Sequence, residues 1–133
     1  MIKFKLRIVT PRGIYKEIDI DQLNVKTTDG HIGILANHIP LASCLDIAQM
    51  NFLIDGKRER FALHGGFVYV ADEMTKIITN AIESEDEIDI ERANAAYTRA
   101  KERLKETKDQ YEIQRAEIAL KRAITRMNLK NHN

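Results

Sequence analysis

The sequence predicts an α+β protein in two parts, an N-terminal all-β sandwich over residues 1–84 and a C-terminal antiparallel αα-hairpin over residues 85–133. All six glycines and both prolines lie at or before Gly66, and the 67 residues after it contain neither. Glycine and proline are the residues that most readily form turns between strands. The spacing of apolar residues also changes from strand-like to helical near Ile88. We therefore expect short strands first and long helices afterwards.

Alternating segments separated by turn signals indicate a sandwich or a barrel in the first part. Residues 4–8 (FKLRI) alternate apolar with basic side chains, as a half-buried strand does. Met50, Phe52 and Ile54 alternate in the same way and lead into Asp55-Gly56, a strong signal for a hairpin turn.

Four further expectations concern particular residues or short segments of this part. Asn37 is expected to take a positive φ, which asparagine tolerates better than most residues. Gly65-Gly66 is expected to permit close approach of another backbone segment. Residues 74–82 are expected to form the last strand. Cys44, the only cysteine, excludes an internal disulfide, fits a reducing compartment and is expected to be packed.

The second part has the pattern of two amphipathic helices. The first presents one apolar face, made of Ala93, Ala96, Ala100 and Leu104. Residues 107–110 (TKDQ) have the form of a capping box, so we expect a second helix to start near Lys108. Its apolar face comprises Ile113, Ala116, Leu120, Ala123 and Met127. His132 is expected to lie in a fraying tail.

The seam between these helices is small, because most of its residues are alanine. Full burial of a large aliphatic side chain contributes about 1.5–3 kcal/mol, whereas ordering one residue costs about 1–2 kcal/mol. A hairpin on an alanine seam is therefore marginally stable alone. We expect it to dock on the β part, bind a ligand or exchange partners, which makes it a movable element.

Charge is divided unevenly along the chain. Residues 1–87 carry 10 basic and 13 acidic side chains, whereas residues 88–133 carry 11 basic and 7 acidic ones, so the net charges are −3 and +4.

In the second part, four arginines recur beside the seam: Arg92, Arg99, Arg122 and Arg126. Guanidinium groups gathered along one groove repel one another unless an anion intervenes, and arginine suits phosphate. Glu83 and Asp89 stand where they could bind the hydroxyls or amino group of a nucleotide. The alternative is that these are solvated arginines paired with Glu91, Glu102 and Glu117.

No pattern in the sequence indicates catalysis. The chain has no phosphate-binding P-loop and no G-x-S-x-G motif. His31, His38 and His64 match no metal-binding spacing, and we expect them to be satisfied by backbone groups. No run reaches 18 apolar residues, so we expect no direct membrane insertion. We predict neither a catalytic residue, nor a metal site, nor a catalytic cofactor.

Four segments together resemble the epsilon subunit of bacterial rotary (F-type) ATP synthase. They are residues 28–35 (TDGHIGIL), 37–41 (NHIPL), 63–70 (LHGGFVYV) and 88–93 (IDIERA), and they occur in the order of that family over essentially the whole chain. Three positions depart from the family pattern. Asn37 stands where a glycine is usual, His64 where a small residue is common, and His31 where an acidic or polar residue is common.

The resemblance implies a non-catalytic central-stalk subunit on the cytoplasmic face of the bacterial cell membrane, where it takes part in hydrogen ion transport and ATP synthesis. The sandwich would bind the gamma subunit and rest Asp29, Gly30, His31 and Ile32 on the c-ring. The hairpin would extend into the catalytic head of alpha and beta subunits and inhibit ATP hydrolysis. Its basic residues Lys121, Arg122 and Arg126 are suited to an acidic surface there.

In some members of that family, ATP binds the folded hairpin as a regulatory ligand. The positions that match the nucleotide site are Glu83, Ile88, Asp89, Arg92, Ala93, Arg99, Arg122 and Arg126. A requirement for Mg²⁺ stays open. Two alternatives from other functional classes remain, an adaptor that uses the basic helices to bind nucleic acid or protein, and a small hydrolase that uses His38 or His64. We expect no nucleic-acid partner, because the excess of basic charge is modest.

Overall fold

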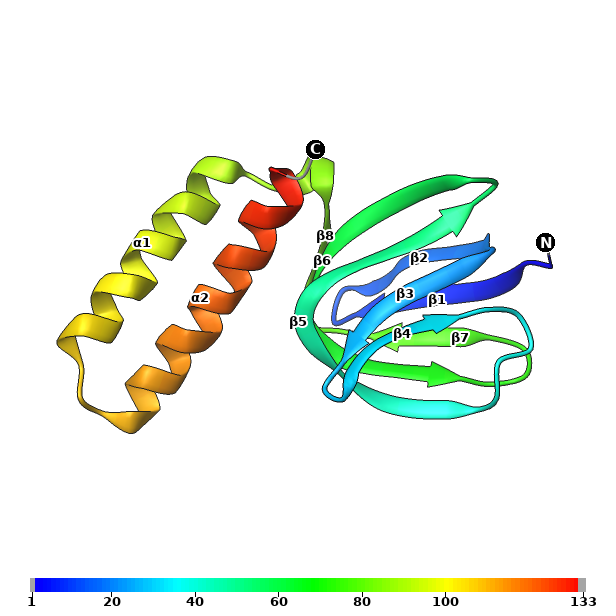
Figure 1. Ribbon diagram of the computed structural model, residues 1–133, viewed down its shortest axis with the longest axis horizontal. Helices are drawn as coiled ribbons and strands as arrows, with labels where there is room; N and C mark the ends of the chain where they lie inside the picture. The colour runs from blue at the N-terminus through cyan, green and yellow to red at the C-terminus, as the bar shows by residue number, and fades with distance from the viewer. Residues whose placement is uncertain (1, 132–133) are drawn as a thin grey trace.

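The computed structural model describes residues 2–131 and shows a β-sandwich with two helices beside it (Figure 1), so the predicted fold class is confirmed. His132 lies outside the described residues. The strands are β1 (Phe4–Thr10), β2 (Gly13–Ile20), β3 (Gln22–Thr27), β4 (Gly30–Ile34), β5 (Leu41–Ile54), β6 (Lys57–Val70), β7 (Thr75–Ile78) and β8 (Ile82–Ser84). A 3₁₀ turn, η1 (Glu85–Glu87), leads to α1 (Ile90–Glu106) and α2 (Gln110–Lys130).

The two long strands β5 and β6 organise the sandwich. The strand order is β2-β1-β7-β6-β5-β3-β4, and β8 pairs with β6 off this path. β5 and β6 are joined by the predicted hairpin turn, in which Asp55 and Gly56 have φ of 51° and 81°. Asn37 also has the expected positive φ, at 65°. The predicted hairpin turn at Asp55-Gly56 and the predicted positive φ of Asn37 are therefore both confirmed.

Alternation along β6 places its side chains on two different surfaces. Phe61 and Leu63 belong to the main core cluster inside the sandwich, together with residues such as Leu6, Phe52 and Ile77. Ala62, between them, belongs to a second buried cluster with Ile88 and Leu129 of the hairpin. Successive side chains of a strand point to opposite faces. The outer face of β6 is therefore covered by the helical part.

The expected strand over residues 74–82 is wrong, because it is broken into β7 and β8. Between them the Thr79 hydroxyl donates to the Ala81 carbonyl over 3.1 Å and turns the chain. β7 pairs with the second half of β6, whereas β8 pairs with residues 61–63 of its first half. At this crossing, a Cβ built on Gly66 would lie 2.0 Å from the Ile78 carbonyl oxygen. The expected close backbone approach is confirmed.

The hairpin has the predicted seam but a different second cap. Ala93, Ala100, Ala116 and Ala123 are buried between the helices. The residue that caps α2 is Asp109, whose carboxylate accepts the Tyr111 N–H over 3.1 Å, so α2 starts at Gln110. The Thr107 hydroxyl instead accepts the Asp109 N–H in the connecting turn. The predicted capping box is therefore wrong, because Asp109, which directly precedes Gln110, supplies the capping side chain in place of Thr107.

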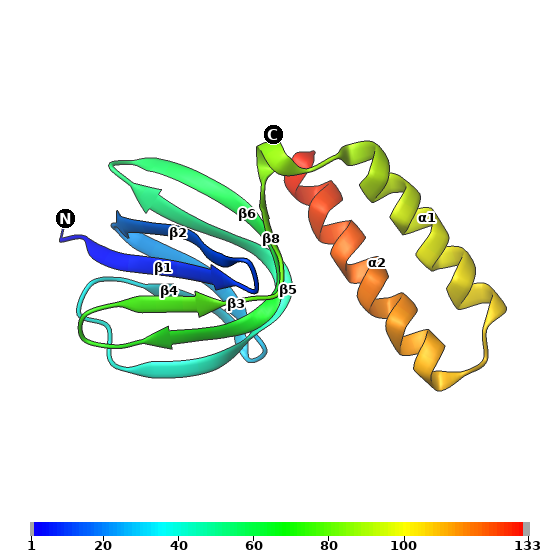
Figure 2. The same ribbon diagram turned by 180° about the vertical axis from the view of Figure 1, so that it is seen from behind.

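α2 lies between the sandwich and α1, as both views show (Figures 1 and 2). Leu129 is fully buried against Ala62 and Ile88. The Lys121 ammonium lies 2.8 Å from Asp46 Oδ1, and Lys26 lies 3.4 Å from Asp46 Oδ2. The apolar cluster and Asp46 therefore hold α2 on the outer face of β5 and β6. Within residues 2–131, no helix is long and apolar enough to cross a membrane.

Cys44 is exposed, which corrects the expectation that it is packed. It stands one position before buried Leu45 on β5, so strand alternation turns its side chain away from the core. The apolar residues Leu41 and Ile47 on either side of Cys44 do not indicate which face of the strand the cysteine occupies.

We predict that a chain ending at Glu87 folds as an independent sandwich. The main core cluster consists of residues at or before Ile82, so removing the hairpin leaves it intact. Thermal unfolding of this fragment should be cooperative, and its amide NMR spectrum should remain dispersed. A chain ending at Thr79 is the matched control, because it loses Ile82 and the β8 pairing and should be much less stable. A fragment ending at Glu87 without a cooperative transition would contradict the prediction.

Candidate functional site

A cavity of about 270 Å³ lies at the base of the hairpin, where the sandwich meets both helices. The first three turns of α1 form one wall, and β8, η1 and α2 contribute the others. The lining residues are Glu83, Glu87, Asp89, Arg92, Ala93, Ala95, Ala96, Arg99 and Arg126. Because its walls come from all these elements, the cavity exists only while the hairpin is folded against the sandwich.

The structure brings together six of the eight residues expected at a nucleotide site, namely Glu83, Asp89, Arg92, Ala93, Arg99 and Arg126. The other two do not line the cavity. Ile88 is 5% exposed and packs against Ala62 and Leu129 instead. Arg122 is exposed on α2. Sequence reasoning missed Glu87, Ala95 and Ala96, although the acidic run before α1 and the alanine spacing were visible signals.

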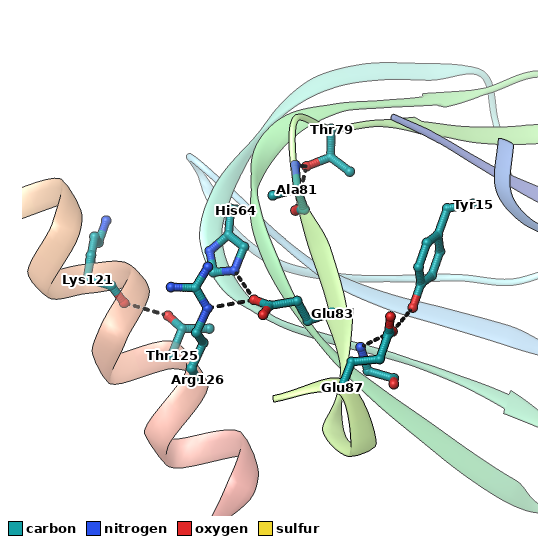
Figure 3. Close-up of polar contacts among 10 residues, drawn as sticks. Tyr15, His64, Thr79, Ala81, Glu83, Glu87, Lys121, Thr125 and Arg126 are labelled. Carbon is teal, nitrogen blue, oxygen red and sulfur yellow. Dashed lines mark hydrogen bonds and ion pairs between the residues drawn. The ribbon is translucent and has the colours of Figure 1, made fainter. Parts of the chain in front are cut away.

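The Glu83 carboxylate joins the sandwich to α2 (Figure 3). Its Oε1 accepts hydrogen bonds from Arg126 Nε over 2.6 Å and from His64 Nε2 over 3.0 Å. Burial raises the pKa of Glu83, but the Arg126 and His64 hydrogen bonds outweigh it, and the net pKa is lowered. Glu83 therefore stays ionised, and its charge is shared between a strand and a helix.

The acidic residues around the start of α1 are held by local hydrogen bonds. Asp89 caps α1, and its Oδ1 accepts the N–H groups of Glu91 and Arg92 over 3.1 and 3.2 Å. The Glu87 carboxylate accepts the Ser84 N–H over 2.9 Å and the Tyr15 hydroxyl. The Tyr15 hydrogen bond, followed by that of Ser84, lowers the pKa of Glu87. These contacts fix the cavity rim and the direction of α1.

Arg92 and Arg99 supply positive charge to the cavity wall, and within the described residues 2–131 neither forms an ion pair with a carboxylate. They are seven residues apart, about two helical turns, and so lie on one side of α1. Among residues 2–131, no ion pair joins either of them to Glu91, Glu102 or Glu117. Both arginines are exposed, as the solvated alternative expects, but within residues 2–131 they lack the expected glutamate partners. Ala93 and Ala96 line the same cavity, and their small side chains take up little of its space.

The other predicted site residues occupy two separate places. Asp29 lies in the turn between β3 and β4, and Gly30, His31 and Ile32 lie on β4, with Asp29 and His31 exposed. The Thr27 hydroxyl accepts the Asp29 N–H over 3.1 Å and donates to the Gly30 carbonyl over 2.9 Å, so two hydrogen bonds close this exposed turn.

Lys121, Arg122 and Arg126 lie on α2, but they differ in their partners. Lys121 pairs with Asp46 and Arg126 with Glu83, whereas Arg122 is exposed. In the docked hairpin, sandwich carboxylates therefore already pair with two of the three cations expected to inhibit ATP hydrolysis.

The three histidines stand on different segments. His31 is on β4, His38 follows it in the loop, and His64 is on β6. The His38 Nδ1 lies 2.7 Å from the Ile39 carbonyl, as expected of a histidine satisfied by backbone. The His64 ring is held by Glu83 instead, so the expectation of a backbone partner is wrong for that side chain.

Two domains of the ATP synthase Delta/Epsilon chain family match this chain. The beta-sandwich domain matches residues 3–85, and the long alpha-helix domain matches residues 86–131. ATP synthase epsilon chains of three bacteria are similar over nearly the whole length. That of Ruminococcus albus is 40% identical and covers 98% of both chains. That of Shouchella clausii is 40% identical and covers 99% of this chain and 98% of its own, and that of Bacillus licheniformis is 41% identical and covers 97% and 98%.

Solved structures of mitochondrial ATP synthases contain the same fold. A chain in the Euglena gracilis OSCP/F1/c-ring structure has a TM-score of 0.80 at 24% identity and covers 90% of this chain and 76% of its own. A chain in the Tetrahymena thermophila central stalk/c-ring structure has a TM-score of 0.56 at 17% identity, with 97% and 94% covered. The expected relationship to epsilon subunits is confirmed by the bacterial relatives, and with it the expectation of a non-catalytic subunit.

We predict that Arg126→Met raises the pKa of the Glu83 carboxyl. The substitution removes a charge and a hydrogen bond that favour ionisation, while burial continues to favour the protonated form. The pKa should be followed by carboxyl ¹³C NMR during a pH titration. Arg115→Met is the matched control, since Arg115 lies over the Tyr111 ring at the far end of α2 and should not change Glu83. An unchanged Glu83 pKa in Arg126→Met would show that this pair does not control the carboxylate.

Proposed function

Because the chain belongs to the ATP synthase delta/epsilon chain family and its relatives are bacterial epsilon chains, we propose that it is a central-stalk subunit with a nucleotide-controlled hairpin. In this proposal the sandwich binds the gamma subunit and rests the β3–β4 tip on the c-ring. The subunit is peripheral and lies on the cytoplasmic face of the bacterial membrane. The hairpin inhibits ATP hydrolysis when it extends toward the alpha and beta subunits, and bound ATP keeps it folded.

The observation that supports ATP as the ligand is the cavity between the hairpin helices and β8. Three guanidiniums, those of Arg92, Arg99 and Arg126, reach it, and arginine forks bind phosphate oxygens well. Glu83 and Asp89 on the same lining are acceptors for the hydroxyls or the amino group of a nucleoside. In this arrangement ATP is bound without being hydrolysed, since the lining holds neither a P-loop nor a base placed to activate water.

A nucleotide in this cavity would stabilise the folded hairpin selectively. The lining residues come from β8, η1, α1 and α2, so extending the hairpin separates them. At a ligand concentration of 100 times Kd, binding to one form alone adds about 2.7 kcal/mol to its stability. That contribution is comparable with the net stability of a hairpin that has an alanine seam.

We predict that ATP raises the melting temperature of the hairpin and compacts the chain in X-ray scattering, with a weaker effect of ADP because it has one phosphate fewer. Arg92→Ala and Arg99→Ala should each lose most of the response in calorimetric titrations, performed with and without Mg²⁺. Neither residue has an ion-pair partner in residues 2–131, so both variants should dock normally without ATP.

Arg115→Ala is the control for this experiment, because Arg115 has the same charge on an exposed helix position outside the cavity. It should keep the ATP response. Equal loss in all three variants would mean that bulk positive charge, and not a formed site, produces the effect. An absence of ATP binding to the unchanged chain would refute the nucleotide part of the proposal.

The proposed inhibition competes with docking for the same cations of α2. Asp46 is a sandwich carboxylate that holds Lys121. Asp46→Asn removes that partner and leaves the basic surface of α2 intact, so extension is favoured. A partly exposed ion pair contributes about 0.2–1 kcal/mol, which corresponds to at most about a fivefold change.

We therefore predict that Asp46→Asn increases inhibition of ATP hydrolysis in the assembled enzyme by about two- to fivefold. Lys121→Met breaks the same pair but also removes a cation from the inhibitory surface, so it should not increase inhibition. Replacing Lys121, Arg122 and Arg126 together by Ala should relieve inhibition altogether. If hydrolysis rates are the same in all these variants, these α2 cations do not carry inhibition.

A further inference from the structure

His64 is a titratable side chain buried beneath the docked hairpin. The residue is 4% exposed and lies two positions after Ala62, so both occupy the outer face of β6. Ala62 is covered by Leu129 of α2. Figure 3 shows the His64 ring between the strands and α2, beside Arg126. Its burial therefore depends on α2.

The hydrogen bonds of the ring define its protonation state. The ring Nε2 lies 3.0 Å from Glu83 Oε1, and an ionised carboxylate only accepts, so Nε2 carries the proton. The other nitrogen, Nδ1, is buried and has no hydrogen-bond partner in the described part of the chain. A second proton would therefore create a buried N–H donor without an acceptor, which is unfavourable.

The charges around His64 also oppose its protonation. β8 contributes Glu83, whose charge is already shared with Arg126. α2 contributes the positive charges of Arg126 and Arg122. On β5 the residue opposite is Ile47, and the neighbouring Asp46 is engaged by Lys26 and Lys121. Burial, together with the two arginines, lowers the pKa of His64 against the opposing effect of Glu83.

We propose that uptake of a proton by His64 releases α2 from the sandwich, so that acidification favours the undocked hairpin. When α2 leaves, water reaches Nδ1 and the two arginines move away. Glu83 stays, because β8 remains paired with β6 opposite Ala62. Protonated His64 then has a solvated N–H and a nearby carboxylate. The proposal rests on the movable hairpin of the proposed function and adds a second signal to it.

The sign and size of the effect follow from linkage. The docked form has the lower His64 pKa, so docking is fully favoured above the ordinary pKa of about 6.5 and weakens as the pH falls below it. Between about pH 7.5 and pH 5.5 the ratio of docked to undocked chains should fall by up to about tenfold.

The test is fluorescence energy transfer between dyes on Cys44, which is exposed on β5, and on Lys108→Cys in the turn between the helices, measured without nucleotide. The chain with His64 should undock as the pH falls across that range. The same labelled chain carrying His64→Gln should change less than about twofold, because the amide can donate to Glu83 but does not titrate. Glu83→Gln should undock at both ends of the range.

Equal pH dependence in the unchanged chain and in the His64→Gln variant would overturn the proposal, and so would a constant transfer efficiency in both. Adding ATP to the same labelled chains at the upper pH separates the two hypotheses. If ATP raises the docked fraction while pH has no effect through His64, the stabilisation of the docked hairpin by ATP is supported and the role of His64 is refuted. If pH acts through His64 but ATP has no effect, the role of His64 is supported and the stabilisation of the docked hairpin by ATP is refuted.

Discussion

The hydrogen bonds of the Glu83 carboxylate are the contacts on which the rest of this structure depends. Glu83 is fixed by the pairing of β8 with β6, and its Oε1 accepts from His64 on one side and Arg126 on the other. Without the Arg126 contact, α2 loses an ion pair with the sandwich and keeps the one between Lys121 and Asp46. Without docked α2, the cavity loses a wall and His64 loses its cover. The docking contact, the proposed nucleotide cavity and the proposed proton switch therefore share one carboxylate.

The alanine seam has two consequences that cannot be separated. Small side chains bring the helices close, and beside Arg92 and Arg99 they leave the space of the cavity. They also bury little apolar area, so the hairpin gains limited stability from its own packing. A seam of leucines would stabilise the pair and fill the cavity. The same residues that make room for an anion thus make the hairpin sensitive to whether one is bound.

Much of this could be predicted from the sequence, because it depends on local spacing. Alternation, the Asp55-Gly56 turn and the helical faces each follow from neighbouring residues, and the seven-residue spacing places Arg92 and Arg99 on one side of α1. Contacts between distant segments could not be predicted in this way. The break between β7 and β8 depends on which half of β6 each strand pairs with. The burial of His64 and Leu129 depends on α2 lying over β6, and no periodicity in either segment indicates that surface.

The two helices differ in their ion-pair partners, and this difference suits the binding and release that we propose. Two cations of α2, Lys121 and Arg126, are paired with Asp46 and Glu83 of the sandwich, so moving α2 breaks both ion pairs. The arginines of α1 at the cavity have no such pairs within residues 2–131, so an anion can bind them without breaking an existing contact. A ligand on α1 therefore adds stability to the docked state, whereas a competing acidic surface must replace the sandwich carboxylates of α2. α1 is accordingly the helix suited to sensing a ligand, and α2 the helix suited to exchanging partners.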